Sequence, residues 1–282
     1  PAELDFQQEA ANMARFRGCM EGNKDVVSPV ARPELTTARV LTMNFVEGVH
    51  VNDVEGIRGL GIEPKAVTRL VNCMYSQSIF LHGWVHCDPH PGNLLVRRCP
   101  TTSKPQLVVL DHGLYRELTP EFRTTYCRLW HAIILGDVEG IRKHGEAMGA
   151  RGMPELFAAI ITAKTWNQLA SSGGADRLNV KHTKAQQELV RVNARAYAAE
   201  ITAILNACPR ELLLLLKTND CLRTIGATLG DADDTYRVMA RDCVVGLAPA
   251  DASWGSWVSK WWARAGIEAR LVAWSALAWL YK

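Results

Sequence analysis

A short polar motif that ends at Asn93, followed by two apolar runs, most constrains how this chain folds. The motif reads His-Cys-Asp-Pro-His-Pro-Gly-Asn, and the runs are Leu94–Val96 and Leu107–Leu110. A connection rich in Pro, Thr, Ser and Lys separates the runs, which predicts a β-hairpin. Asn93 precedes the first strand and Asp111 follows the second, so pairing brings both to one end of the hairpin. Asp88, on the entering loop, is expected to join them.

These side chains form a set of hard oxygen donors. One amide oxygen and two carboxylates suit Mg²⁺ that is bound to phosphates. The spacing also matches protein-kinase catalytic loops, which read H-R-D-x-x-x-x-N and lead across a hairpin to D-F-G. Here His86, Asp88 and Asn93 have that spacing, and Asp111-His112-Gly113 stands in the D-F-G position. We therefore predict a nucleotide-binding phosphotransferase site.

Several stretches resemble the aarF-domain, or UbiB-like, atypical kinase family: VLTMNFVEG, FLHGWVHCDPHPGNLLVRR, VVLDHGLYRELTPEFR and LLLLLKTNDCLR. With DHG in place of DFG, the chain looks most like the mitochondrial branch. The resemblance runs from Glu3 to about residue 245. It implies an α+β, protein-kinase-like fold with a partial N-lobe over 1–46, a mainly helical C-lobe over 47–248 and a Trp-rich tail over 249–282.

The resemblance also implies roles at the motif. Asp88 is the implied catalytic-loop aspartate, Asn93 a metal ligand and Asp111 the principal Mg²⁺ ligand. The implied cofactors are ATP and Mg²⁺. His112, in the place of an apolar Phe, either bonds to the catalytic loop or fills space. His86 is expected to be a packed, hydrogen-bonded scaffold residue.

Further nucleotide-site residues follow from the family alone. Glu3 and Asp5 look like its ExD pair, and Glu9 like the helix-C glutamate that pairs with a strand lysine. The family resemblance also implies a hinge segment between the lobes, with Met43, Asn44 and Val46. Backbone groups of Asn44 and Val46, behind Met43, would bind the adenine.

The family's alanine-rich loop, KxGQ element and strand lysine all precede the ExD pair. Lys24 follows the first helix and cannot be that lysine. We therefore expect the chain to begin inside the N-lobe. We also expect the apolar face of the helix over 2–20 to be exposed.

The acceptor is predicted from a short connection. Only Leu114–Leu118 separates the DHG motif from a helix capped by Thr119, which leaves no room for a long activation segment. A small-molecule or lipid acceptor, or hydrolysis of ATP, is therefore expected. The family's association with quinone and lipid homeostasis agrees, and by resemblance the location is mitochondrial.

Three alternatives stay open. The first is a metal-hydrolase cluster, in which His82, His86 and His90 join Asp88. The second is a non-catalytic pseudokinase module that binds a lipid or a partner. The third is a small-molecule kinase of the aminoglycoside or choline type.

Composition excludes some partners. The net charge of +3 over 282 residues argues against nucleic acid. Eight scattered cysteines without a CxxC pair favour a reducing compartment. Six of nine tryptophans lie between Trp254 and Trp279, beside Lys260 and Arg264. Residues 254–282 are therefore expected to contact a membrane surface or to pack back on the C-lobe, with disorder or an oligomer contact as the third alternative.

Hydrophobic periodicity predicts the remaining elements. A buried strand is predicted over 39–46, a helix from Pro64 to Gly83 and a short strand at Trp84-Val85. The later predicted helices are 137–148, 154–169, 183–206, 209–217, 219–229 and 233–246.

Overall fold

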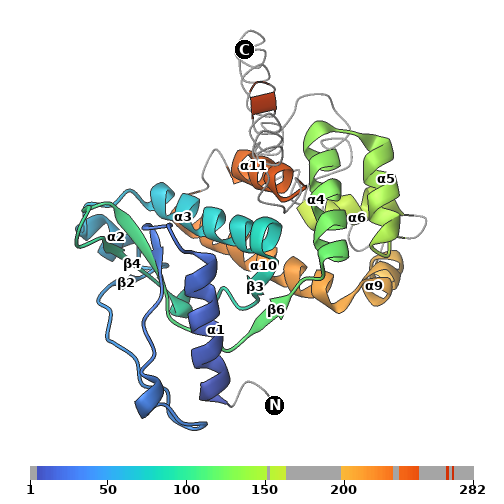
Figure 1. The fold of residues 1–282 in the computed structure, drawn as a ribbon. Coiled ribbons are helices and arrows are strands. Elements are labelled where there is room, and N and C mark those ends of the chain that lie inside the picture. Colours follow the sequence, from blue (N-terminus) through green and yellow to red (C-terminus); the bar gives the residue numbers. More distant parts are fainter. Residues whose placement is uncertain are drawn as a thin grey trace. The chain divides into compact units, whose positions relative to one another are not determined.

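The computed structural model describes residues 5–150, 153–162, 198–230 and 235–247, together with 265, 266 and 269 (Figure 1). The chain divides into two compact units. The first unit contains residues 1–118 and 217–233, and the second contains 119–216 and 234–282. The sequence-based boundaries at 46 and 248 stay predictions.

The first unit begins with helix α1, Phe6–Cys19. Asp5 caps this helix, because its Oδ1 accepts a hydrogen bond of 3.0 Å from the backbone N–H of Gln7. The predicted helix is thus confirmed where the structure describes it. The expected exposure of its apolar face is wrong: Met13 and Phe16 are both 1% exposed. Both side chains lie in the core of this unit.

A four-stranded sheet carries the predicted hairpin. Its order is β1 (Val26–Val27), β5 (Pro105–Val109), β4 (Leu94–Arg98) and β2 (Val49–His50). β1 is parallel to β5, whereas β4 is antiparallel to both β5 and β2. Leu94 pairs with Val109, so the chain enters β4 and leaves β5 at the same end of the sheet. The hairpin prediction is confirmed.

The predicted buried strand over 39–46 is wrong. This segment makes only isolated bridges, Ala31 with Met43 and Thr37 with Val40. Three of its apolar side chains are exposed, Phe45 at 87%, Val40 at 55% and Met43 at 38%, and none is fully buried. The run has the residue composition of a strand. In the described part of the chain, however, it forms only these isolated bridges and joins neither sheet, so its side chains are not covered as those of a central strand would be.

Helices α2 (Val54–Gly59) and α3 (Pro64–Ser76) precede the polar motif over 86–93. α3 continues into one turn of π-helix over Gln77–His82. Gly83 ends the turn in the left-handed region, at φ 63°, which glycine adopts without a steric cost. The helix predicted from Pro64 to Gly83 is therefore confirmed, with a change of helix type in its last turn.

A second, two-stranded sheet follows directly. β3 (Trp84–His86) pairs antiparallel with β6 (Tyr115–Glu117), and His86 lies opposite Tyr115. The predicted strand at Trp84-Val85 is confirmed, whereas β6 was not predicted. β6 follows the DHG motif, and β3 precedes the loop over 86–93. Their pairing therefore brings the chain after the DHG motif back beside the start of that loop.

The second unit is helical. Its helices include α4 (Pro120–Leu135), α5 (Val138–Ala147), α6 (Pro154–Thr162), α9 (Ala198–Ala207) and α11 (Thr235–Leu247). α4 packs against both α5 and α11. Thr119 caps α4, as predicted, by accepting a hydrogen bond of 3.2 Å from the N–H of Phe122.

The predicted break between 217 and 219 is wrong. One continuous helix, α10, runs over Arg210–Leu229. Thr218 lies between the two predicted helices and Asn219 begins the second, but both are buried, at 0% and 8% exposure. Their burial within the first unit outweighs their weak preference for helix ends.

Other predicted segments lie outside the described residues. They are Glu3, the parts of the predicted helices over 163–169 and 183–197, and nearly all of the tail over 249–282. Among the helices that the structure describes, none has both the length and the apolar character needed to cross a bilayer.

Candidate active site

The predicted catalytic loop, residues 86–93, connects the two sheets of the first unit, since it lies between β3 and β4. At its start the backbone N–H of Cys87 donates 3.0 Å to the carbonyl of Leu114. A 3₁₀ turn over Pro91–Asn93 then closes the loop, and the Nδ1 of His90 caps it by accepting a hydrogen bond of 3.1 Å from the N–H of Gly92. Two prolines further limit the backbone, since each fixes its own φ. These hydrogen bonds and prolines therefore fix the backbone conformation of the loop without a ligand.

Asn93 and Asp111 meet at the end of the hairpin, as the sequence predicts. The Nδ2 of Asn93 donates to Oδ2 of Asp111 over 3.1 Å, and the N–H of Leu110 donates to the carbonyl of Asn93 over 2.9 Å. The other carboxylate oxygen of Asp111 accepts a hydrogen bond of 2.7 Å from the N–H of Gly113. The DHG backbone thus orients the carboxylate of its own aspartate.

Asp88 lies on the other side of Asn93. The Nδ2 of Asn93 is 3.4 Å from the backbone carbonyl of Asp88. The Asp88 carboxylate is 39% exposed and forms an ion pair of 3.4 Å with the Nζ of Lys217, on α10. The three residues predicted to carry the chemistry are therefore neighbours.

The donor set at this place fits Mg²⁺. Each oxygen of the Asp111 carboxylate accepts one hydrogen bond and keeps a further lone pair, and the Oδ1 of Asn93 remains as an acceptor. Mg²⁺ is commonly held by one or two carboxylates plus substrate phosphates, with waters completing its shell. In the described part of the chain no three His, Cys, Asp or Glu side chains gather in a way that could hold a metal ion by themselves. A site of this kind depends on phosphate oxygens.

Helix α1 contacts the DHG motif through one face. The Oε1 of Glu9 accepts a hydrogen bond of 3.1 Å from the N–H of His112, and the Nδ2 of Asn12 donates 2.9 Å to the His112 carbonyl. Phe16, one turn further on, packs against the His112 ring at a centroid distance of 5.1 Å. Burial raises the pKa of Glu9, and the nearby charge of Asp111 adds to the increase. The role of Asn12 was not predicted, although positions 9, 12 and 16 share a helix face.

His112 is fully buried and bonded on both ring nitrogens. The carbonyl of Val109, 3.1 Å from Nε2, can only accept, so Nε2 carries the proton, and Ser28 Oγ lies 2.8 Å from the same nitrogen. Nδ1 then accepts from the hydroxyl of Tyr115 over 2.9 Å. Desolvation lowers the pKa of His112 to about 3, so the ring is neutral. The sequence leaves two roles open for His112, a hydrogen bond to the catalytic loop or simple filling of space. Neither describes the ring fully, because it forms hydrogen bonds to β5, Ser28 and β6.

His86 is a scaffold residue, as predicted. It is 1% exposed, and its Nδ1 lies 2.8 Å from the hydroxyl of Tyr75. Desolvation lowers the pKa of His86 to about 4. With His90 used to cap the 3₁₀ turn, these histidines support the fold of the loop and do not form the metal-hydrolase cluster that the spacing had left open.

The predicted hinge residues lie on a separate segment. The backbone N–H of Asn44 donates to the carbonyl of Val30 over 3.2 Å, and the side-chain Oδ1 of Asn44 accepts a hydrogen bond of 2.6 Å from the N–H of Val30. Met43 forms the bridge to Ala31, and Val46 is half-buried. The Asn44 N–H is thus already bonded, and adenine contacts at Met43, Asn44 and Val46 stay predictions. Asp5 serves as the cap of α1.

Like Asn12, Lys217 was not predicted from the sequence, although it contacts Asp88. It follows a run of five leucines, Leu212–Leu216, in the helix predicted over 209–217. A single lysine directly after such a run is the signal that could have marked it.

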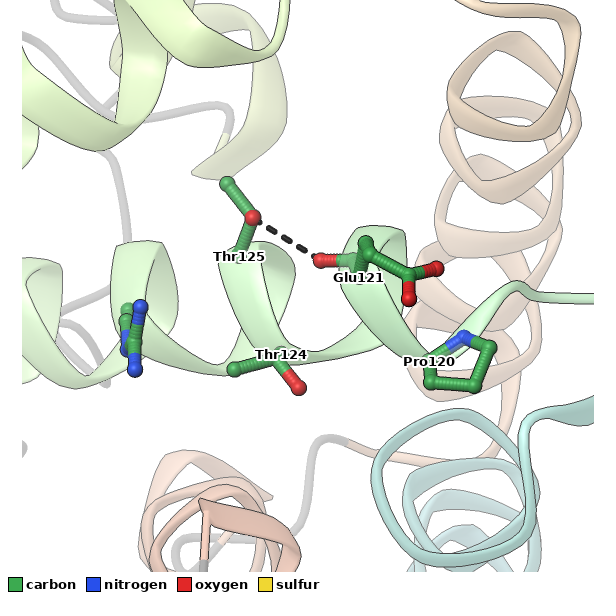
Figure 2. A pocket seen from close by; sticks show the side chains of 5 residues that line it. Pro120, Glu121, Thr124 and Thr125 are labelled. Carbon is green, nitrogen blue, oxygen red and sulfur yellow. Dashed lines mark hydrogen bonds between the residues drawn. The ribbon is translucent and has the colours of Figure 1, made fainter.

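The second unit has a shallow surface hollow of about 340 Å³ on α4 (Figure 2). Its lining residues are Pro120, Glu121, Thr124, Thr125 and Arg128. The hydroxyl of Thr125 is already bonded to the carbonyl of Glu121 over 2.9 Å. None of the predicted site residues lines this hollow.

Known proteins resemble the chain over most of its length. Residues 1–145 match the model of the ABC1 atypical kinase-like domain. The chain is 40% identical over 263 residues to AarF domain-containing protein kinase 1 of Xenopus laevis, covering 90% of this chain and 49% of that protein. It is 37% identical over 245 residues to a probable serine/threonine-protein kinase, abkB, of Dictyostelium discoideum, covering 87% of this chain and 34% of that protein.

Among solved structures, the Rv3197–erythromycin complex from Mycobacterium tuberculosis shares the fold. The TM-score is 0.55 at 16% identity, over 88% of this chain and 60% of that one. The chain spans about half the length of its Xenopus and mouse relatives named AarF domain-containing protein kinase 1.

Proposed function

Because the chain belongs to the ABC1, or AarF-domain, atypical kinase-like family, we propose that it binds Mg-ATP and transfers or hydrolyses the terminal phosphate. The observation that carries the proposal is the contact chain from Asp88 through Asn93 to Asp111. It joins the Asp88 carboxylate, which is paired with Lys217, to an oxygen donor set suited to Mg²⁺. The fold is mixed, with a kinase-like arrangement of catalytic loop, hairpin and DHG motif.

Asn93 and Asp111 are the residues that would hold Mg²⁺. A bound Mg²⁺ supplies charge neutralisation for the phosphates. The protein's own contribution is the orientation of those oxygens, through the N–H of Gly113 and the amide of Asn93. A side chain at position 113 would crowd this arrangement, because a Cβ there would lie 3.2 Å from the Asp111 Oδ1.

Asp88 is the group that receives the proton. The bond between the terminal phosphorus and the bridging oxygen breaks, and a new bond forms from an acceptor hydroxyl or water oxygen to that phosphorus. The attacking oxygen gives its proton to Asp88, and the diphosphate leaves with the bridging electron pair. Because positioning and charge supply most of the catalysis of phosphoryl transfer, a loop rigidified by hydrogen bonds and proline serves this role.

The acceptor proposed is a small molecule or a lipid-linked compound, or water itself. The support is the path of the chain after the DHG motif. Leu114 accepts the N–H of Cys87, β6 pairs with β3, and the N–H of Leu118 donates 2.7 Å to the carbonyl of Gly83. This connection is bonded to the fold along its length, so it offers no platform on which a peptide would lie.

The proposed setting is mitochondrial lipid or quinone homeostasis, with contact to a membrane surface through residues 254–282. The support is the resemblance of the DHG-bearing motif and the Trp-rich, basic composition of that tail. A reducing interior agrees with eight cysteines that are all free.

The test is binding of fluorescent N-methylanthraniloyl-ADP to residues 1–282 with Mg²⁺ and with excess EDTA, together with phosphate release from Mg-ATP. We expect saturable binding that EDTA abolishes. Binding that is equal with and without Mg²⁺, or absent in both, would contradict the proposal.

Two other functions remain as outcomes of this test. Metal-dependent binding without any phosphate release, on addition of lipid or quinone acceptors, would favour the pseudokinase module. Phosphate transfer to a free aminoglycoside or to choline would favour a small-molecule kinase of that type.

A further inference from the structure

Lys217 places a positive charge directly beside the catalytic loop. Its Nζ lies 3.4 Å from the Asp88 Oδ1, and both residues belong to the first unit. The two residues are 129 positions apart in the sequence. The contact therefore depends on how α10 is placed against the loop.

The helix is anchored at this point. Thr218 and Asn219, the next two residues, are 0% and 8% exposed, whereas the Lys217 side chain is 55% exposed. The backbone of Lys217 is thus held by packed neighbours while its ammonium reaches toward the loop. An exposed ion pair contributes only about 0–1 kcal/mol to folding. Stability is therefore a weak explanation for a lysine at this position.

The site has an excess of negative charge. Asp88, Asp111 and Glu9 bring three carboxylates close together, and the loop over 86–93 contains no lysine or arginine. The Nδ1 of His90 accepts the N–H of Gly92 and so is not available to a ligand. A polyphosphate bound at this site is stabilised by a nearby cation. The stabilisation is larger in the transition state of phosphoryl transfer, in which negative charge develops on the phosphate oxygens.

We propose that Lys217 contacts the terminal phosphate of the bound nucleoside triphosphate, so that the site distinguishes a triphosphate from a diphosphate. This inference rests on the proposed function. Asp88 orients the attacking oxygen, which must approach the terminal phosphorus to about 3–3.5 Å. The Lys217 ammonium, which is paired with Asp88, therefore lies next to the terminal phosphate and far from the adenine of the bound nucleotide.

The chemistry of lysine suits both contacts at once. The ammonium has three N–H donors on a flexible four-carbon stem. One N–H keeps the Asp88 carboxylate oriented, and another is available to a phosphate oxygen.

The experiment compares two nucleotides on the full chain. Unlabelled Mg-ADP and the non-hydrolysable Mg-AMPPNP each displace N-methylanthraniloyl-ADP from the parent and from Lys217→Met, Lys217→Gln and Lys217→Arg. The matched control is Arg223→Met, which removes a charge from the same helix at a residue paired with Asp220 over 3.4 Å. Thermal melting of each variant without ligand checks that it is folded.

We expect Lys217→Met and Lys217→Gln to weaken AMPPNP binding about tenfold, because a charge-assisted contact is lost, and to leave ADP binding within about twofold of the parent. Lys217→Arg restores most of the AMPPNP affinity, and Arg223→Met leaves both affinities at the parent's values. A purely structural role for Lys217 would weaken both nucleotides alike.

Several results would overturn the inference. An unchanged ratio of AMPPNP to ADP affinity in Lys217→Met and Lys217→Gln would reject it while leaving the proposed function intact. An equal effect of Arg223→Met would show a general charge effect. A parent chain that binds neither nucleotide would reject the proposed function itself, and the inference with it.

Discussion

The side-chain amide of Asn93 donates to the carboxylate of Asp111 over 3.1 Å, although 18 positions separate the two residues in the sequence. The strand pairing of Leu94 with Val109 brings them together, because these residues adjoin Asn93 and Leu110 at one end of the hairpin. The same amide reaches the backbone of Asp88 over 3.4 Å. Asn93 therefore links the proposed metal donors to the proposed proton acceptor.

Asp111→Asn and Asn93→Ala should abolish Mg²⁺-dependent nucleotide binding. Each removes an oxygen donor, and Asn93→Ala also removes the hydrogen bond that orients the Asp111 carboxylate. The thermal shift produced by Mg-ADP measures the loss, since a ligand that binds only the folded state stabilises it by RT ln(1 + [L]/Kd), which falls as Kd rises. Asn52→Ala, at an exposed position beside β2, is the control and should keep the parent's shift. A site variant that shifts as much as the parent would contradict the assignment.

Asp88→Asn should separate binding from turnover. The amide keeps the size of the side chain but cannot accept the proton of an attacking oxygen, so phosphate release should fall by about 10²–10⁴. Mg-ADP affinity should remain near the parent's value, because Asp88 is not among the proposed metal donors. The two quantities are measured side by side by a phosphate-release assay and nucleotide displacement. Equal losses in both would assign Asp88 to metal binding instead.

Tyr115→Phe should destabilise the first unit by about 1–3 kcal/mol, the cost of leaving a buried acceptor without a partner. The acceptor is the Nδ1 of His112, which is fully buried and receives the Tyr115 hydroxyl over 2.9 Å. The double variant Tyr115→Phe/His112→Phe provides the control. Its loss of stability should be smaller than the sum of the two single losses, because both partners of the bond are then absent. Urea unfolding measures all three, and strict additivity would argue against this hydrogen bond.

Burial of His86 should make folding stability depend on pH. Its pKa in the folded chain is about 4, below the ordinary value of 6.5, so the unfolded state binds more protons between these values. The contribution is therefore complete above about pH 6.5 and is lost as the pH falls toward 4. The difference of about 2.5 in pKa corresponds to on the order of 3 kcal/mol.

The measurement is the urea midpoint between pH 7 and pH 4.5, for the parent and for His86→Gln. The variant should have a shallower loss of stability on acidification, since it has no buried imidazole to protonate. His50→Gln, at the exposed end of β2, removes a surface histidine and should follow the parent. A His86→Gln curve parallel to the parent's would contradict the prediction.

Membrane association should depend on residues 254–282. This segment contains Lys260, Arg264, Arg270 and Lys282 against the single acid Glu268, so anionic vesicles should bind it more strongly than neutral ones. Co-sedimentation of residues 1–282 is compared with that of residues 1–253. The control keeps the charges and replaces Trp254, Trp257 and Trp261 by alanine; its binding should fall toward that of the shorter chain. Equal sedimentation of all three proteins would contradict membrane contact and would indicate that the tryptophans pack against the protein instead.

The sequence was sufficient for the hairpin and for the juxtaposition of Asn93 with Asp111. Both follow from local patterns: two β-rich apolar runs, a turn-forming connection, and polar residues at their ends. The helices that begin at Pro64 and Pro120 were predictable for the same reason, since proline in the first turn and periodic apolar residues are local signals. The sequence motifs also identified the family.

The tertiary structure decided what local patterns cannot encode. The run over 39–46 has the composition of a buried strand, yet Phe45 is 87% exposed, because burial of a strand depends on neighbours from elsewhere in the chain. Asn12 and Phe16 contact His112 across roughly a hundred positions, and Lys217 meets Asp88 across 129. Such pairs exist only once helices have packed against loops. The sequence by itself thus determined which oxygen donors share the hairpin end, and the packing of α1 and α10 determined which carboxylates, backbone groups and cation surround them.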